Sequence, residues 1–281
     1  MNSIIVTSDF TKESRSAVNY AARLALLTRS ELLVLHATNI PVVSDAFIDV
    51  SITLDELDRS DKEKMDELVR QISSKYGPAL KIKGNSEIGL TTELLEDLAE
   101  SHQNCLVVMG MKHVDRFTEL LFGSTSTDMV GRLNCPLMII PQDARFRPWK
   151  KIAFAFDDKD FPTDSGVSLI KGLEEKFDSK FHYIHIIDDD NPIRQVQTIE
   201  NVKDYLGRTA QVHFVDAGDH ATVEALEDWV RRYKCNVLVM VARKHTLLER
   251  IFKSSHSRKM AFKSAVPLLI LSENNKNNPW K

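Results

Sequence analysis

Apolar runs alternate with segments of helical period along the whole chain. The runs are short and rich in β-branched residues, and in the longer segments between them apolar residues recur with the spacing of one helix face. This alternation is typical of βα units packed on a parallel sheet. In the first half it predicts strands at 4–9, 31–37, 79–84, 105–110 and 136–141, and helices at 12–28, 54–76, 91–102 and 125–133.

The second half repeats this order. It predicts strands at 151–157, 181–188, 211–218, 236–241 and 267–271. An offset of 131 residues aligns ELLEDL at 93–98 with EALEDW at 224–229 without a gap, whereas Asp9 matches Asp157 at an offset of 148. The second repeat is therefore shorter by 148 − 131 = 17 residues. Internal repetition of this kind predicts two copies of one fold in one chain.

The repeat divides the chain into two domains. We expect a first domain at 1–141, a linker at 142–150, a second, shorter domain at 151–272, and a disordered tail at 273–281. The linker, QDARFRPWK, is polar with one proline, and it is short enough to keep the two domains in contact. The tail is low in apolar residues apart from Trp280, which is why we expect disorder there.

Composition narrows the class of protein. The chain is 43% hydrophobic and 27% charged with a net charge of −3, which indicates a soluble globular protein and disfavours nucleic acid as a partner. No signal peptide and no run long enough to cross a membrane is present, so we expect a cytoplasmic protein. Cys105, Cys135 and Cys235 are too few and too far apart in sequence for a disulfide framework or a paired zinc site. They are predicted to be buried thiols in a reducing compartment.

Two local features add a family resemblance. An aspartate ends the first strand, and glycines followed by a serine flank the loop after the fourth. With these features the sequence resembles the universal stress protein family, as a tandem member, over essentially the whole chain, including IIVTSDFTKESRSAVNYAARLA and GSTSTDMVGRLNCPLMIIP. The resemblance implies an α/β fold of two flavodoxin-like lobes, related to the adenine nucleotide alpha hydrolases. Each would be a five-stranded parallel sheet of order 3-2-1-4-5 between helices. The last strands would pair to make an intramolecular pseudo-dimer.

The loop after the fourth strand carries the candidate chemistry. Nucleotide-binding members of the family have Gly-x2-Gly-x9-Gly-Ser/Thr here, and the matching residues are Gly110, His113, Gly123 and Ser124. Glycines permit positive φ and close approach of backbone N–H groups, and a helix N-terminus favours an anion. His113 replaces the second glycine. It either blocks the phosphate or donates a hydrogen bond to it, and the sequence leaves both open.

The remaining site residues follow from the expected topology. In a sheet of this order the crevice opens between strands 1 and 4, where Thr7, Ser8 and Asp9 end one strand and Met109 ends the other beside Gly110. The resemblance implies that Asp9 contacts ribose or base, that Met109 faces the base, and that Ser124 and Thr125 meet phosphate. The ligand would be ATP or another adenine nucleotide, bound with or without Mg²⁺.

The second repeat has lost this motif. The offset places Val241, Lys244 and Ser254 at the positions of Gly110, His113 and Gly123. Acidic residues follow its first two strands and would repel a triphosphate: Asp157, Asp158, Asp160, Asp188, Asp189 and Asp190. We therefore expect nucleotide in the first domain only.

The functional expectation is a stress-response or signalling protein whose contacts with a protein partner depend on its ligand. It has no recognised catalytic motif and is not expected to be an enzyme. The alternative is a ligand-free interaction scaffold in which both sites are degenerate, and a third hypothesis is a nucleotide-hydrolysing enzyme. A monomer and a homodimer are both compatible with the sequence.

Overall fold

The computed structural model describes residues 1–39, 50–102, 104–111, 124–130, 132–156, 164–187, 191–208, 210–216, 222–242, 266–272 and 279–280. Its strands are β1 (Ser3–Thr7), β2 (Glu31–Thr38), β3 (Ile82–Ile88), β4 (Cys105–Gly110), β5 (Leu137–Ile140), β6 (Lys151–Phe156), β7 (Lys180–Ile187), β8 (Gln211–Asp216), β9 (Val237–Ala242) and β10 (Leu268–Ser272). Its helices are α1 (Lys12–Thr28), α2 (Val50–Tyr76), α3 (Thr91–Ser101), α4 (Ser124–Met129), α5 (Asp164–Phe177), α6 (Pro192–Leu206) and α7 (Thr222–Arg232). We call residues 1–141 the first lobe and residues 151–272 the second lobe.

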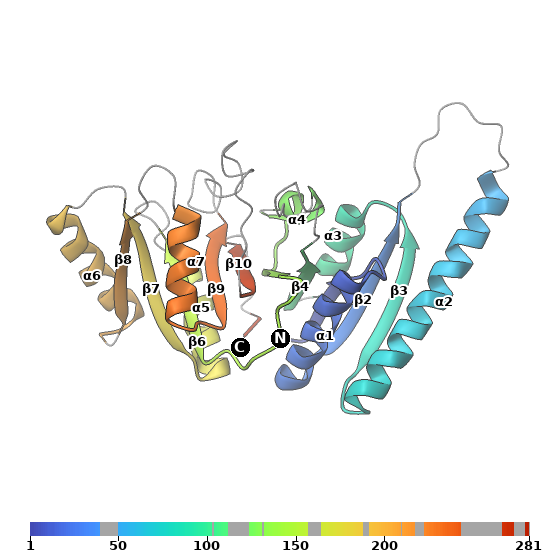
Figure 1. Cartoon of the computed structure of the whole chain (residues 1–281), viewed down its shortest axis with the longest axis horizontal. Helices are drawn as coiled ribbons and strands as arrows, with labels where there is room; N and C mark the ends of the chain where they lie inside the picture. Colours follow the sequence, from blue (N-terminus) through green and yellow to red (C-terminus); the bar gives the residue numbers. More distant parts are fainter. Residues whose placement is uncertain are drawn as a thin grey trace.

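All ten strands form one continuous sheet. Its order is β3-β2-β1-β4-β5-β10-β9-β6-β7-β8, so each lobe has the order 3-2-1-4-5 counted from its own first strand. Pairing is parallel within each lobe and antiparallel between β5 and β10, where Leu269 lies opposite Met138. Figure 1 shows the two lobes side by side, with α2 at one end of the molecule and α6 at the other. The predicted fold class, strand order and pairing of the last strands are confirmed.

The core consists of two layers, one on each face of the sheet, and both run through both lobes. One layer receives buried side chains from α1, α2, α5 and α6, represented by Leu24, Met65, Ile170 and Val202. The other receives Leu95 from α3, Met129 from α4 and Leu226 from α7. Burial of apolar side chains is the main stabilising contribution to folding. Because each layer crosses from β5 to β10, the two lobes share their cores.

The predicted boundaries are displaced by three or more residues at three elements. β3 begins at Ile82 rather than 79, and α2 begins at Val50 rather than 54. α4 ends at Met129 rather than 133. The shift in β3 has a physical cause, because the apolar pattern locates burial and not backbone pairing. Leu80 is buried in the turn before the strand, while the edge strand itself continues through exposed polar residues.

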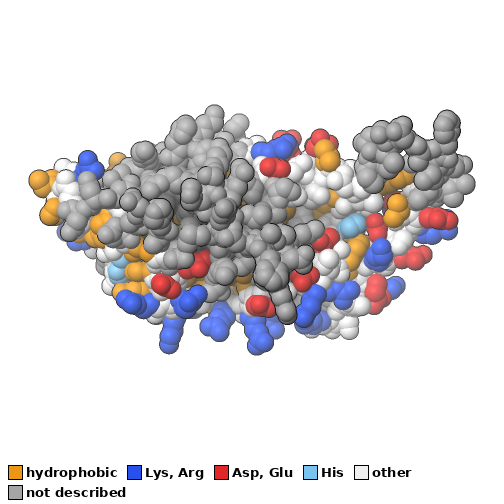
Figure 2. All heavy atoms as spheres, turned by 45° about the horizontal axis from the view of Figure 1, so that its top comes forward, with side chains coloured by type: hydrophobic (Ala, Val, Ile, Leu, Met, Phe, Trp, Pro, Cys, Tyr) orange, Lys and Arg blue, Asp and Glu red, His pale blue; other side chains and the backbone are white. Residues whose placement is uncertain are grey.

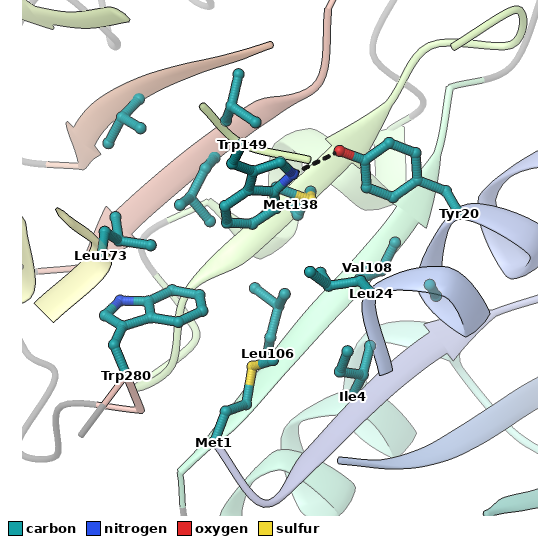
Figure 3. Close-up of a cluster of buried hydrophobic side chains, with 14 of the residues drawn as sticks. Met1, Ile4, Tyr20, Leu24, Leu106, Val108, Met138, Trp149, Leu173 and Trp280 are labelled. Carbon is teal, nitrogen blue, oxygen red and sulfur yellow. Dashed lines mark hydrogen bonds between the residues drawn. The ribbon is translucent and has the colours of Figure 1, made fainter. Parts of the chain in front are cut away.

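The linker and the tail each bury a tryptophan. Trp149 of the linker is fully buried, and its Nε1 donates a hydrogen bond to the Tyr20 hydroxyl at 2.9 Å. The Trp280 ring lies 6.3 Å from that of Trp149 and 6.0 Å from that of Phe177. Figure 3 shows Trp149, Trp280 and Met1 in one cluster. The prediction of a disordered tail is therefore wrong at 279–280, because Trp280 is only 3% exposed. Residues 273–278 and 281 lie outside the described residues.

The surface carries both signs of charge. In Figure 2, Lys and Arg side chains gather along the lower edge of the described surface, and Asp and Glu side chains are spread over it. Within the described ranges, no helix has the length and apolar character that crossing a membrane requires.

Candidate functional site

A cavity of about 190 Å³ lies at the carboxyl ends of β1 and β4. Six of the nine predicted site residues line it: Thr7, Ser8, Asp9, Met109, Gly110 and Thr125. Residues that the sequence did not single out complete the wall: Thr11, Glu13, Ser14, Leu35, His36, Ala37, Thr91 and Met111. Ser124 begins α4, but only its backbone is described, and His113 and Gly123 lie outside the described residues. The structure thus brings together segments that are about a hundred residues apart in the sequence.

The position of the cavity follows from the topology. β1 and β4 are hydrogen-bonded neighbours, with Val6 opposite Val108, so the segments that leave their carboxyl ends begin side by side. The next strands along the chain, β2 and β5, lie on opposite sides of this pair. Connections therefore diverge here, and a crevice opens where doubly wound sheets bind their ligands.

The turn from β1 into α1 fixes Asp9 in the cavity wall. An Asp9 Oδ1 atom accepts hydrogen bonds from the Thr11 amide at 3.2 Å and from the Thr11 hydroxyl at 2.5 Å. Thr11 in turn caps α1, since its hydroxyl accepts from the Ser14 amide. Phe10 has φ 62°, and its amide donates to the Ser8 hydroxyl. This left-handed residue turns the chain sharply, so that Ser8 and Asp9 are held rather than left to move freely.

A hydrogen-bonded histidine lies behind this turn. His36 Nδ1 lies 2.7 Å from the Ser8 carbonyl oxygen, and Nε2 lies 3.3 Å from Asp61 Oδ2. Burial raises the pKa of the Asp61 carboxyl, but hydrogen bonds from Lys64 and Thr38 outweigh burial and lower it overall. Asp61 is therefore ionised near neutral pH, and it orients the His36 ring. Sequence reasoning missed His36, although its place at the carboxyl end of the strand beside β1 was a usable signal.

The described wall of the cavity is acidic. Asp9 and Glu13 contribute carboxylates, and no Lys or Arg belongs to the described lining. Carboxylates accept hydrogen bonds, which suits ligand hydroxyl groups, whereas they repel phosphate. The segment 112–123 contains Lys112, His113 and Arg116 in sequence, but it lies outside the described residues. The described wall is thus chemically suited to the uncharged part of a ligand.

Gly110 is the last residue of β4, and its φ is not positive. A Cβ added to Gly110 would lie 3.4 Å from the Cβ of Ala17 and 3.6 Å from the Glu13 carbonyl oxygen. Both are ordinary van der Waals distances, so the end of β4 packs against the first turns of α1 and still leaves room for a Cβ.

Comparison with known proteins identifies the family of this chain. The model of the universal stress protein family matches residues 1–141. This chain belongs to the universal stress protein family. A search of curated proteins found no match.

Several solved structures share the fold. A universal stress protein from Archaeoglobus fulgidus is 17% identical, with a TM-score of 0.71 over 96% of this chain and 98% of that chain. A second, from Pseudomonas aeruginosa, is 14% identical, with a TM-score of 0.55 over 97% and 93%. A universal stress protein in complex with cAMP aligns 98% of its length with 50% of this chain at 19% identity and a TM-score of 0.35. The full-length matches show that other chains share the two-lobe fold.

The second lobe of this universal stress protein has the same topology with different residues at the corresponding place. Val241 occupies the position of Gly110, near the end of β9, and is 3% exposed. Lys244, Ser254 and the six aspartates lie outside the described residues, so that part of the prediction stays a prediction. Within the described part of the chain, no group of three or more His, Cys, Asp or Glu could hold a metal ion.

Proposed function

We propose that this universal stress protein binds ATP or another adenine nucleotide in the first-lobe cavity, and that binding controls its contacts with a protein partner in a cytoplasmic stress response. The observation that supports this proposal best is the convergence of six of the nine expected site residues on one cavity at the β1/β4 crevice. Their segments are distant in sequence, so their convergence is not a consequence of chain proximity.

Each part of the cavity suits one part of a nucleotide. Asp9, held by Thr11, would accept hydrogen bonds from ribose hydroxyls. Met109 and Met111 supply an apolar wall for the base. Thr125 would place its hydroxyl near the phosphates, together with Ser124 and the loop that holds His113 and Gly123.

The charges predict the orientation of the ligand and the effect of a cation. Since Asp9 and Glu13 would repel phosphate, the phosphates would point toward α4 and away from α1. Mg²⁺ bound to the phosphates would reduce the remaining repulsion, so we expect ATP to bind more tightly with Mg²⁺ than without it.

We propose that the second lobe is a shortened, divergent copy of the same domain that binds no nucleotide, and that the protein is not an enzyme. The alternative function is a ligand-free scaffold. It is favoured by the replacement of the second motif glycine by His113 and by the lack of Lys or Arg in the described cavity lining.

The first prediction tests nucleotide binding with two variants. Asp9→Ala removes the proposed ribose contact, and Thr125→Val removes a hydroxyl while keeping the shape of the side chain. Each should weaken ATP binding at least about tenfold, which corresponds to about 1.4 kcal/mol. Isothermal titration calorimetry, with and without MgCl₂, measures the effect.

Asp204→Ala, on the exposed side of α6, is the matched control and should bind ATP like the wild type. No ATP binding by the wild type up to millimolar concentration would exclude the proposal and favour the scaffold. Steady phosphate release that Asp9→Ala abolishes would instead favour the enzyme. Chromatography of denatured purified protein would reveal nucleotide that copurifies.

A further inference from the structure

A second cavity of about 260 Å³ lies at the opposite end of the strands of the first lobe, where β4 and β5 begin. Its wall includes the first residue of β4, Cys105, and the residues just before β5, among them Cys135. Arg132, His102 and Pro279 also line it. The nucleotide proposal uses none of these residues, and two of them are thiols that are distant in the sequence.

The register of the sheet brings the two thiols together. β4 and β5 are parallel, with Val107 opposite Leu137. Two residues earlier along each strand, the same register places Cys135 opposite Cys105. The hydrogen bond from the Val107 amide to the Pro136 carbonyl, at 3.0 Å, shows that the pairing extends to this end. Adjacent strands lie about 4.8 Å apart, and disulfides need a Cα separation of about 4.4 to 6.8 Å. Both cysteines pack against the same core layer, so their side chains lie on the same face.

The thiols already interact. The Cys105 thiol donates to the Ala99 carbonyl oxygen at 3.8 Å. The interaction with Cys135 lowers the pKa of Cys105, whereas the interaction with Cys105 and burial raise the pKa of Cys135. Cys105 is therefore the group that ionises first. Cys105 is buried in the sheet but meets the cavity, and Cys135 is half-buried. All three cysteines of the chain are free in this structure.

We propose that Cys105 and Cys135 form a redox-active dithiol, which a hydroperoxide such as hydrogen peroxide converts into an intramolecular disulfide. This site is independent of the nucleotide proposal. The third cysteine provides a contrast, because burial raises the pKa of Cys235 to about 11, so this thiol is protonated near neutral pH. The offset of 131 residues places Asn236 and Val266, neither of them a thiol, at the positions of Cys105 and Cys135.

The oxidation proceeds in two steps, and its atoms and electrons balance. The Cys105 thiolate attacks one oxygen of hydrogen peroxide, the O–O bond breaks, and the departing hydroxide takes a proton to leave as water. The Cys135 thiol then attacks the resulting sulfenic sulfur. The S–S bond forms as the S–O bond breaks, and the hydroxyl leaves with the Cys135 proton as a second water. Two thiols are oxidised and one peroxide is reduced. In a reducing compartment a thiol donor restores the dithiol, so the disulfide is reversible.

The second prediction is tested on the full chain with hydrogen peroxide, at a concentration that fully oxidises dithiothreitol in the same buffer. Titration of free thiols after denaturation should fall from three to one. Proteolysis and mass spectrometry should give one peptide pair joined between Cys105 and Cys135, and dithiothreitol should restore three thiols. Three thiols remaining, a bond that uses Cys235, or a bond between two chains would each overturn the proposal.

Two variants sharpen the experiment. Cys235→Ser, the matched control, should still lose two thiols and give the same joined peptides. Cys135→Ser should give no joined peptide, and its Cys105 should become a sulfenic acid that dimedone traps. Dimedone labelling of Cys235 alone in that variant would contradict the assignment. If Cys135→Ser does not fold, the peptide pair in the wild type still decides the question.

Discussion

At the scale of single residues, the second lobe contains a pair of neighbouring histidines beneath α7, the buried His182 and the half-buried His213. His182 Nδ1 lies 3.2 Å from His213 Nε2, and the His182 ring packs against Trp229 at 5.5 Å. His185, three residues along β7, packs on the other face against Phe156, because residues three apart on a strand point to opposite faces. Burial, then the neighbouring His213, Lys180 and Lys151, lowers the pKa of His182 to about 4.

The third prediction is a loss of stability in mild acid. Because the pKa of His182 is lower in the folded protein than its ordinary value of 6.5, the unfolded chain takes up the proton first. The stability present above about pH 6.5 is therefore lost as the pH falls toward 4, with a slope of at most about 1.4 kcal/mol per pH unit from this group. His182→Phe should reduce the slope, measured by urea unfolding at several pH values.

The matched control for this experiment is Tyr233→Phe, which changes the same aromatic cluster and keeps both histidines. It should retain the slope of the wild type. An equal slope in His182→Phe and the wild type would show that this ring does not determine the acid sensitivity.

At the scale of elements, close packing explains positions that hydrophobic pattern alone did not. A Cβ on Gly84 of β3 would lie 2.5 Å from Met65 Cγ, so glycine lets α2 lie close against the edge strand. At the other end of the chain, the ring of Trp280 packs against the rings of Trp149 of the linker and Phe177 of α5, which also contact each other at 4.4 Å. Linker, tail and helix thus form one packed unit (Figure 3).

The fourth prediction concerns this unit. Trp280→Ala should lower the free energy of unfolding by about 3 kcal/mol, because it removes a buried aromatic ring and leaves a cavity. Trp280→Phe should cost less, since most of the ring contact remains. Urea denaturation measures both variants, and equal midpoints in Trp280→Ala and the wild type would support the disordered tail that composition predicted.

At the scale of the whole molecule, the two lobes are joined by a sheet and not only by a linker. β5 and β10 pair along their edges, and both core layers continue across that seam. An unpaired β5 would expose backbone donors and acceptors beside the apolar side chains of Leu137–Ile140, which are buried in the full chain.

The fifth prediction follows from this seam. The isolated segment 1–150, which keeps the Trp149–Tyr20 hydrogen bond, should associate through β5 at micromolar concentration. The full chain, whose β5 is covered, is the control and should not associate through this edge. Analytical ultracentrifugation measures both. An isolated segment that stays monomeric would show that β5 does not drive association.

The sequence by itself determined the fold class, the repeat and most of the described wall of the first-lobe cavity, because each depends on local pattern. Alternating apolar runs specify βα units, and order 3-2-1-4-5 places Asp9 and Met109 at one crevice. Only the tertiary structure decided what depends on contacts between distant segments. It placed His36 in the cavity wall with Asp61 hydrogen-bonded to it, buried Trp280 of a polar tail, and set Cys105 opposite Cys135. No single segment contains the information for these contacts, since each depends on a register or packing that both partners create together.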